Sequence, residues 1–349
     1  MKVTVHVGPT KTGSTALQKS LAANRKLLRK HGILYPITRD KGFNHNILLA
    51  GLKHQRQIPR LVWHDLQSSG ETPAQCFQRE AAFIARQIRR HRPAHIILSS
   101  EGLFRKPTQF VPEFWTALLA DFEFTLDYVA YVRDPAKRLV SSAQQRLRHS
   151  HRLKLSADHL RMGPVLAAIE AAGPVRLKCF DRIRAEAIDL ARDFLADIAP
   201  DLPTNRFNTP PANETMSAEA MVVLQDYRAA LHAESANEPR GDVRQLLRQF
   251  KALGEMGGNV VRPRLRAAVE RQVYAALAAD IDWLAERYTI DLSACIDRRV
   301  IDADPGGELD LQAIDSAAHL CEVDPARVDW LRHRIMQRLL QTERKKRPR

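Results

Sequence analysis

The sequence contains few cysteines and no long apolar run. Its four cysteines, at positions 76, 179, 295 and 321, stand far apart in 349 residues. This spacing argues against a disulfide framework or a zinc site, and we expect a protein of the reducing cytoplasm. No apolar stretch approaches the roughly 20 residues that cross a bilayer. Because a strand pattern begins almost at the first residue, we expect neither a transmembrane segment nor a signal peptide.

Aromatic residues are also scarce, whereas positive charge is abundant. Aromatics make up 6% of the chain, and 54 lysines and arginines against 40 acidic residues give a net charge of +14. Such a charge favours anionic partners. The basic clusters at 146–154 and 344–349 have no interleaved aromatics of the kind that stack on single-stranded nucleic acid. We therefore predict no specific nucleic-acid recognition, and a non-catalytic polyanion-binding protein stays as an alternative.

Strand and helix patterns alternate along the first 200 residues. Apolar strand patterns occupy 3–7, 94–101, 124–134 and 175–180. Helical patterns between and after them occupy 14–31, 73–91 and 185–198. This alternation predicts an α/β chain with a central parallel sheet that helices cover on both faces.

The rest of the chain is mostly helical in pattern. Helical periodicity recurs at 217–233, 242–253, 264–287 and 325–341, after a Pro- and Asn-rich connection at 200–214. We divide the chain into a core at 1–200, a helical remainder of the same domain at 201–300, and a C-terminal extension at 301–349 with a basic tail. The middle segment is expected to close over cofactor and acceptor.

The first strand pattern ends in a loop that is typical of phosphate binding. Gly8-Pro-Thr-Lys-Thr-Gly-Ser-Thr15 lies between a β-branched run and the start of a helix. Backbone N–H groups in such a loop and in the first helical turn have no intrahelical partner and can face an anion. In a nucleoside triphosphatase loop the lysine follows the second glycine. Here Ser14 follows Gly13, and the lysine, Lys11, precedes it.

A second anion-binding pattern follows the strand at 124–134. Arg133 ends that strand, Asp134 and Pro135 suit the first positions of a helix, and Ser141 stands eight positions after Arg133. A strand end and the second turn of the next helix converge on one small anion, which the arginine fork binds bidentately. Parallel sheets bind ligands beyond the carboxyl ends of their strands, so we expect this pattern and the loop to face one site.

In these two motifs the chain resembles the P-loop sulfotransferases, and specifically their bacterial carbohydrate-type members. These enzymes transfer sulfonate from 3′-phosphoadenosine 5′-phosphosulfate (PAPS). The family's 5′-phosphosulfate loop also has its lysine before the glycine, and its 3′-phosphate segment has the same arginine-to-serine spacing. The likeness spans residues 1–200 and implies a P-loop NTPase-like, three-layer fold around the central parallel sheet, with a mostly helical C-terminal extension. It implies a catalytic Lys11 at the sulfonate and leaving phosphate, Arg133 and Ser141 at the 3′-phosphate, and a 5′-phosphate cradle of Lys11, Thr12, Gly13, Ser14 and Thr15.

The acceptor hydroxyl must lose a proton, so a general base is expected near the sulfur. Glu101 is the first candidate, because it ends a strand that runs towards the site. The family often places its base at the equivalent strand end, although several members have a histidine there. His45, in Phe43-Asn-His-Asn46, is the second candidate, because neutral imidazole accepts protons near pH 7. His6, inside the first strand, is interpreted as a core residue.

A P-loop kinase or nucleoside triphosphatase that uses ATP is the other enzymatic alternative. It needs a lysine after the second glycine and an acid that holds magnesium. Ser14 stands in the lysine position, and neither strand 95–100 nor strand 125–132 runs directly into a magnesium-binding aspartate. We expect a PAPS-dependent sulfotransferase that needs no metal and acts on a hydroxyl acceptor of the carbohydrate or glycan class. Residues 40–70 and the C-terminal half are expected to bind that acceptor. No pattern indicates an oligomeric state.

Overall fold

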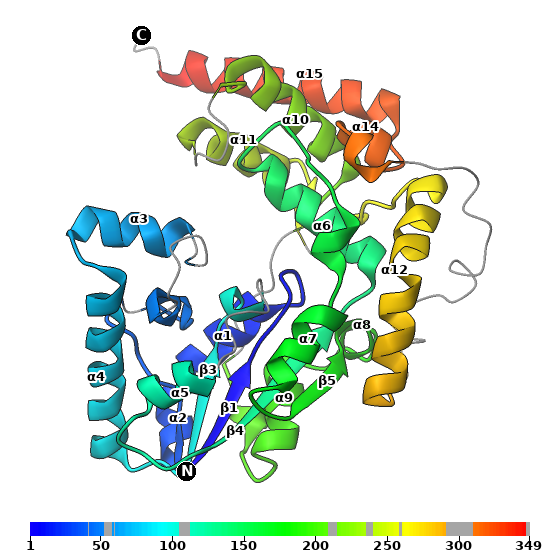
Figure 1. Ribbon diagram of the computed structural model, residues 1–349. Helices are drawn as coiled ribbons and strands as arrows, with labels where there is room; N and C mark the ends of the chain where they lie inside the picture. Colours follow the sequence, from blue (N-terminus) through cyan, green and yellow to red (C-terminus); the bar gives the residue numbers. More distant parts are fainter. Residues whose placement is uncertain are drawn as a thin grey trace. The chain divides into compact units, whose positions relative to one another are not determined.

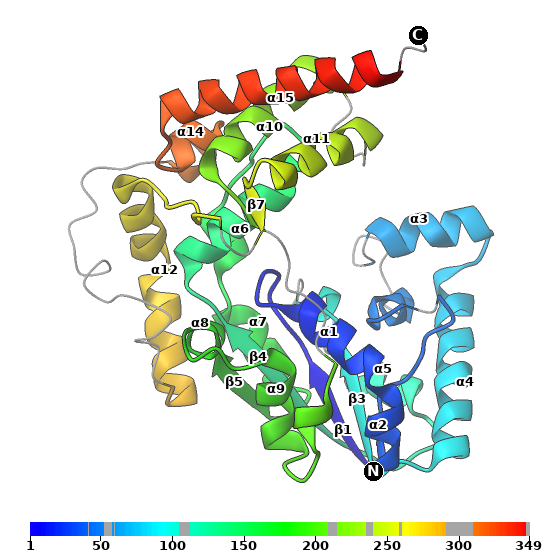
Figure 2. The same ribbon diagram turned by 180° about the vertical axis from the view of Figure 1, so that it is seen from behind.

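The computed structural model describes residues 1–40, 42–51, 58, 60–104, 112–208, 215–234, 240–257, 260–290 and 310–346. Its contacts group into two compact units (Figure 1; Figure 2). The first unit comprises Met1–Arg133, Arg161–Pro211 and Asp280–Ile296. The second comprises Asp134–Leu160, Ala212–Ala279 and Asp297–Arg349.

A five-stranded sheet with the order β2-β3-β1-β4-β5 forms the centre of the first unit. Every pairing in it is parallel. The strands are β1 (Lys2–His6), β2 (Ile33–Leu34), β3 (His95–Ser99), β4 (Thr125–Val132) and β5 (Val175–Cys179). The predicted α/β fold class with a central parallel sheet is therefore confirmed. Since parallel strands end at one edge, the segments after β1, β3 and β4 share the carboxyl edge of the sheet.

Helices cover both faces of this sheet. Leu17, Leu21 and Leu28 pack against Val129 and other core residues on one face. On β4, side chains alternate between faces, so Tyr128 points to the opposite face, where its ring meets Trp115 at 6.2 Å. The apolar residues of these strands are thus buried on both sides, which is why the strands read as near-continuous apolar runs.

Two predicted helices differ in extent from those in the structure. The pattern at 14–31 is divided into α1 (Ser14–Ala23) and α2 (Arg25–Lys30), because the Asn24 side chain donates to the Ser20 carbonyl and accepts from Asn208 N–H. The helix predicted at 185–198 begins only at residue 190, as α9 (Leu190–Ile198), and a separate short helix, α8 (Phe180–Ala185), precedes it. The start was predicted wrongly because Ala187 has a positive φ and Asp189 caps α9 by accepting from two backbone N–H groups.

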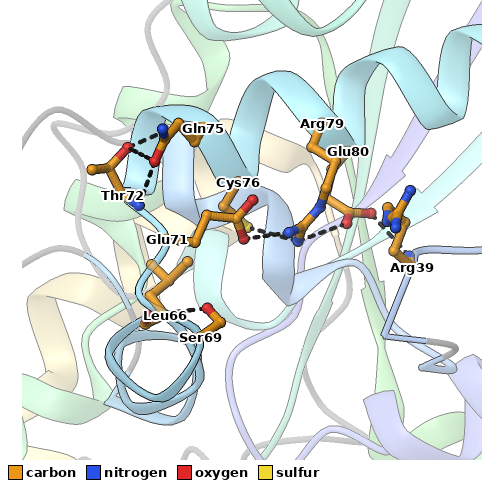
Figure 3. Close-up of polar contacts among 9 residues, drawn as sticks. All are labelled: Arg39, Leu66, Ser69, Glu71, Thr72, Gln75, Cys76, Arg79 and Glu80. Atoms are coloured by element: carbon orange, nitrogen blue, oxygen red, sulfur yellow. Dashed lines mark hydrogen bonds and ion pairs between the residues drawn. The ribbon is translucent and has the colours of Figure 1, made fainter.

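Other helix starts agree with the sequence because the caps are local. Helix α4 spans Pro73–His91 after a Thr72–Gln75 capping box, and α6 spans Pro135–Leu147 with Asp134 as its N-cap. Figure 3 shows the capping box beside an ion-pair network on α4. There the fully buried Glu80 carboxylate is satisfied by Arg79 and by the Arg39 N–H. The remaining elements of the first unit outside the sheet are η1 (Asn46–Gly51), α3 (Arg60–Ser69), η3 (Gly102–Phe104), α5 (Pro112–Leu118), α7 (Gly163–Glu170) and η6 (Thr204–Arg206).

The second unit is built mainly of helices. It contains α6, η5 (Ala157–Leu160), α10 (Ala218–Leu231), α11 (Gly241–Ala252), η7 (Leu311–Ala313), α14 (Ala317–Leu320), α15 (Pro325–Lys346) and the antiparallel pair β6 (Thr215–Met216) and β7 (Met256–Gly257). Helix α12 (Ala267–Tyr288) crosses the boundary after Ala279. The buried Arg228 joins α10 to the end of α6 by donating to the Arg148 and His149 carbonyls.

These contacts place residues 134–160 with the C-terminal helices, so the units are discontinuous in sequence. The predicted divisions at 200 and 300, and the roles assigned to those segments, stay predictions. Among the helices that the structure describes, none has both the length and the apolar character needed to cross a membrane.

The cysteines differ from expectation. Cys76 and Cys321 are free and buried, but Cys179 is disulfide-bonded. The expectation that no disulfide forms was wrong, because separation along the chain does not limit which cysteines meet in the fold. The cysteine pattern therefore gives no support to a reducing compartment.

Candidate functional site

The loop between β1 and α1 is held in an unusual backbone conformation. Lys11 and Gly13 both lie in the left-handed region, with φ of 77° and 80°. Thr12 Oγ1 donates to the Pro9 carbonyl over 2.8 Å, which closes the turn. A left-handed conformation costs a residue with a side chain roughly 1–2 kcal/mol, and such strain is concentrated at functional sites.

This conformation leaves a row of backbone donors at the start of α1. The Gly13 carbonyl accepts from Ala16 and Leu17, and no side chain caps the helix within the described chain. Among the residues described, backbone acceptors are likewise missing for the N–H groups of Thr12, Gly13, Ser14 and Thr15. Unsatisfied N–H groups at a helix N-terminus form a ready anion-binding site.

Gly8 and Gly13 are needed for different steric reasons. A Cβ on Gly8 would lie 2.7 Å from Ser14 Oγ and 3.2 Å from the ring of His6. A Cβ on Gly13 would lie 2.7 Å from both Phe180 and Leu190, in addition to the strain of its positive φ. The two glycines therefore let the loop approach β1 on one side and α8–α9 on the other.

Arg133 lies beside this loop. It follows β4 directly, and its Nη1 donates to the Lys11 carbonyl over 2.6 Å. Its guanidinium also stacks over the Phe180 ring, with 5.6 Å from Cζ to the centroid. The structure thus brings together two of the predicted site residues, Lys11 and Arg133. Ser141 lies in α6, which belongs to the second unit, and its sharing of an anion with Arg133 stays a prediction.

Glu101 stands immediately after β3 at the same edge of the sheet. Its carbonyl accepts from Phe104 N–H at the start of η3, and Ser100 N–H donates to the His6 carbonyl over 3.1 Å. Ser100 Oγ donates to Asn46 Oδ1 over 2.8 Å. The backbone on which Glu101 stands is therefore tied both to β1 and to η1.

His45 is buried in the protein. Its Nδ1 accepts from Ser99 N–H over 3.0 Å, and its Nε2–H donates to the Pro36 carbonyl over 3.1 Å. Burial lowers its pKa to about 4, so the ring is neutral at physiological pH. Both ring nitrogens are engaged by backbone, and accepting a substrate proton would break one of these bonds.

A polar cluster under the loop was not predicted from the sequence. His6 Nδ1 is 2.8 Å from Ser99 Oγ, and Gln18 Nε2 donates to the same oxygen over 3.1 Å. All three side chains are buried. A histidine in an apolar strand and a glutamine in a helix do not by themselves indicate a functional site. The polar residues at the end of strand 94–101 are the sequence feature closest to the place where the two side chains meet.

The remaining expectations about ligands concern metals and the acceptor. No group of three His, Cys, Asp or Glu side chains in the part of the chain that the structure describes could hold a metal ion. Of the segment 40–70, which was expected to contact an acceptor, residues 41, 52–57 and 59 lie outside the described residues.

The chain is similar to a sulfotransferase domain. That solved structure is the sulfotransferase domain from the Synechococcus PCC 7002 olefin synthase, with 16% sequence identity and a TM-score of 0.35. The match covers 72% of this chain and 94% of that chain. No protein-family model and no curated protein matches the sequence.

Proposed function

We propose that this protein is a sulfotransferase that moves sulfonate from PAPS to a hydroxyl group of a carbohydrate. The observation that carries the proposal is the loop at residues 8–15. Within the described residues, the N–H groups of residues 12–15 have no backbone acceptor, and together with the strained Lys11 and the adjacent Arg133 they suit a phosphate-bearing donor. The lysine precedes Gly13, as it does in the sulfotransferases that the sequence resembles.

The donor fits the residues present. The N–H groups of residues 12–15 would hold the 5′-phosphate, where the helix dipole favours negative charge. Lys11 would neutralise charge on the leaving phosphate. Arg133 has five N–H donors in a planar fork, of which one holds the Lys11 carbonyl, and its fork would bind the 3′-phosphate together with Ser141.

The transfer step forms a bond between sulfur and the acceptor oxygen and breaks the bond between sulfur and the phosphate oxygen. The acceptor proton passes to a base, and the second product is adenosine 3′,5′-bisphosphate. Charge spreads over oxygens in such a transfer, so fixed donors and positioning supply most of the acceleration. Glu101 is the base we propose, because both nitrogens of His45 are engaged by backbone.

An ATP-using enzyme fits the loop less well. In that class the residue after the second glycine is a lysine that reaches the β- and γ-phosphates. Here the residue is Ser14, which is buried and packs against Gly8. A short buried hydroxyl does not replace a long cationic side chain.

Thermal unfolding with adenosine 3′,5′-bisphosphate, compared with ATP and Mg²⁺, tests the proposal. A ligand at 100 times its dissociation constant adds about 2.7 kcal/mol to stability. We expect the bisphosphate to raise the melting temperature and adenosine 5′-monophosphate, which lacks the 3′-phosphate, to raise it less. Stabilisation by ATP–Mg²⁺ alone would contradict the proposal.

A further inference from the structure

His6, at the end of β1, has one ring nitrogen, Nε2, to which the proposed mechanism gives no role. The side chain is completely buried, and its ring packs against Tyr131 and Phe194 with centroid distances of 6.0 and 5.9 Å. Nδ1 meets Ser99 Oγ. Nε2 has no hydrogen-bond partner within the described residues.

The second unpartnered atom of this region is the Ser14 hydroxyl. Ser14 Oγ is buried at the start of α1 and also lacks a partner in the described chain. A Cβ on Gly8 would lie 3.2 Å from His6 Nε2 and 2.7 Å from Ser14 Oγ. The two atoms thus flank the same backbone position. Buried polar groups in proteins are nearly always hydrogen-bonded, because leaving one unpaired is costly, so a pair of them beside an anion loop requires an explanation.

Two tautomers of the neutral His6 ring are compatible with the 2.8 Å contact between Nδ1 and Ser99 Oγ, because a hydroxyl oxygen can accept two hydrogen bonds and donate one. Gln18 Nε2 donates to the same oxygen. We take the tautomer in which the Ser99 hydroxyl donates to Nδ1. In that tautomer Nε2 carries the ring proton and presents a donor on the side of Gly8 and Ser14.

We propose that His6 is a positioning residue of the anion loop. When an anion binds, His6 Nε2–H donates to Ser14 Oγ, and the Ser14 hydroxyl donates its own proton to an oxygen of the anion. This chain of donors runs from Gln18 through Ser99, His6 and Ser14 to the ligand. The identification of the anion as the 5′-phosphate of the donor rests on the proposed function, whereas the chain itself does not.

The imidazole acts here without a charge. Burial lowers the pKa of His6 to about 3, so the ring stays neutral throughout the physiological range. The donor chain is consequently independent of pH near neutrality, unlike an ordinary histidine contact with phosphate.

Two substitutions of His6 distinguish the contribution of Nδ1 from that of Nε2. His6→Asn keeps a polar atom near Nδ1 for Ser99 and removes the donor near Nε2. His6→Gln carries its amide at the position of Nε2 and gives up the contact with Ser99. We would measure dissociation constants of the full-length protein for adenosine 3′,5′-bisphosphate and for inorganic pyrophosphate by calorimetry.

His6→Asn and Ser14→Ala should each weaken binding of the anion about tenfold, which corresponds to about 1.4 kcal/mol. His6→Gln should stay near the wild-type affinity. The double variant His6→Asn/Ser14→Ala should bind no more weakly than either single variant, because both remove the same chain. Additive losses would overturn the proposal, as would equal losses in His6→Asn and His6→Gln.

If His6→Asn does not fold, Ser14→Ala decides the question, since unchanged affinity for both probes in that variant overturns the proposal. Wild-type protein that binds pyrophosphate but not the bisphosphate would contradict the proposed function alone, and the comparison of variants then proceeds with pyrophosphate. Wild-type protein that binds neither probe overturns both.

Discussion

Arg133 donates a 2.6 Å hydrogen bond from Nη1 to the carbonyl oxygen of Lys11, from which it is 122 residues distant in sequence. The bond joins the end of β4 to the loop after β1. It orients the peptide unit that follows Lys11, and it holds the guanidinium beside the row of N–H groups at the start of α1. One side chain thereby stabilises the strained loop.

Replacing Arg133 by alanine should weaken nucleotide binding and remove the preference for a 3′-phosphate. Hydrogen bonds to charged groups are worth about 1.5–3 kcal/mol, so we expect adenosine 3′,5′-bisphosphate to lose most of its advantage over adenosine 5′-monophosphate. Calorimetric titration of both nucleotides measures this difference. Arg133→Lys is the matched control, which keeps the charge but loses bidentate geometry and should recover only part of the affinity. A full preference in Arg133→Ala would remove Arg133 from the 3′-phosphate site.

Gly8→Ala should disturb the loop although Gly8 has an ordinary backbone φ. The added methyl group would lie 2.7 Å from Ser14 Oγ and 3.2 Å from the His6 ring, and overpacking of this kind costs about 1–3 kcal/mol. We expect a lower melting temperature and weaker anion binding. Gly241→Ala is the control, because nothing in the described residues lies within 4 Å of a Cβ at that position. Equal melting temperatures for the two variants would contradict the expectation.

Glu101→Gln should reduce turnover while leaving nucleotide affinity unchanged. A positioned general base contributes about 10²–10⁴-fold to rate, and the amide cannot take the proton. Formation of adenosine 3′,5′-bisphosphate from PAPS in the presence of an acceptor measures turnover.

His45→Gln serves as the comparison for Glu101→Gln. It should lower stability, because the Ser99 N–H and the Pro36 carbonyl lose well-placed partners. Its turnover per folded molecule should remain substantial. The reverse pattern, with Glu101→Gln fully active and His45→Gln folded but inactive, would assign the base to His45.

Stability should fall as the pH drops below the ordinary histidine pKa of 6.5. Burial lowers the pKa of His6 to about 3 and those of His45 and His95 to about 4. Between those values and 6.5 the unfolded chain binds more protons than the folded one. The contribution of these neutral histidines to the free energy of unfolding is therefore fully present above pH 6.5. It decreases towards pH 4, by up to about 1.4 kcal/mol per pH unit for each histidine.

Urea unfolding at several pH values between about 7.5 and 5 measures this dependence. His95→Gln should flatten the curve, because its Nε2 contact with Thr4 then no longer titrates. Midpoints that do not change with pH would show that these histidines are not kept neutral by the fold.

The sequence predicted the features that depend on neighbouring residues. The capping box at Thr72 and Gln75 defined the start of α4, and Asp134 with Pro135 defined the start of α6. The strand ends could also be placed, since parallel strands put their carboxyl ends at one edge. These signals act over a few residues, and nothing in the tertiary structure overrides them.

Features that depend on distant residues were not predictable. The division at Asn24 requires Asn208, and the disulfide of Cys179 requires a cysteine elsewhere in the chain. His6 resembles any core histidine in the sequence, and only its position beside Gly8 and Ser14 distinguishes it. The grouping of α6 with the C-terminal helices has the same origin, because it arises from long-range packing.

The left-handed backbone of Lys11 implies a trade-off between stability and activity. With φ of 77°, this position suits glycine better than any residue that carries a side chain. Lys11→Gly should consequently relieve strain and fold at least as well as the natural chain, while it loses the cation that we propose for charge neutralisation at the leaving phosphate. A loop selected for stability alone would have glycine at position 11.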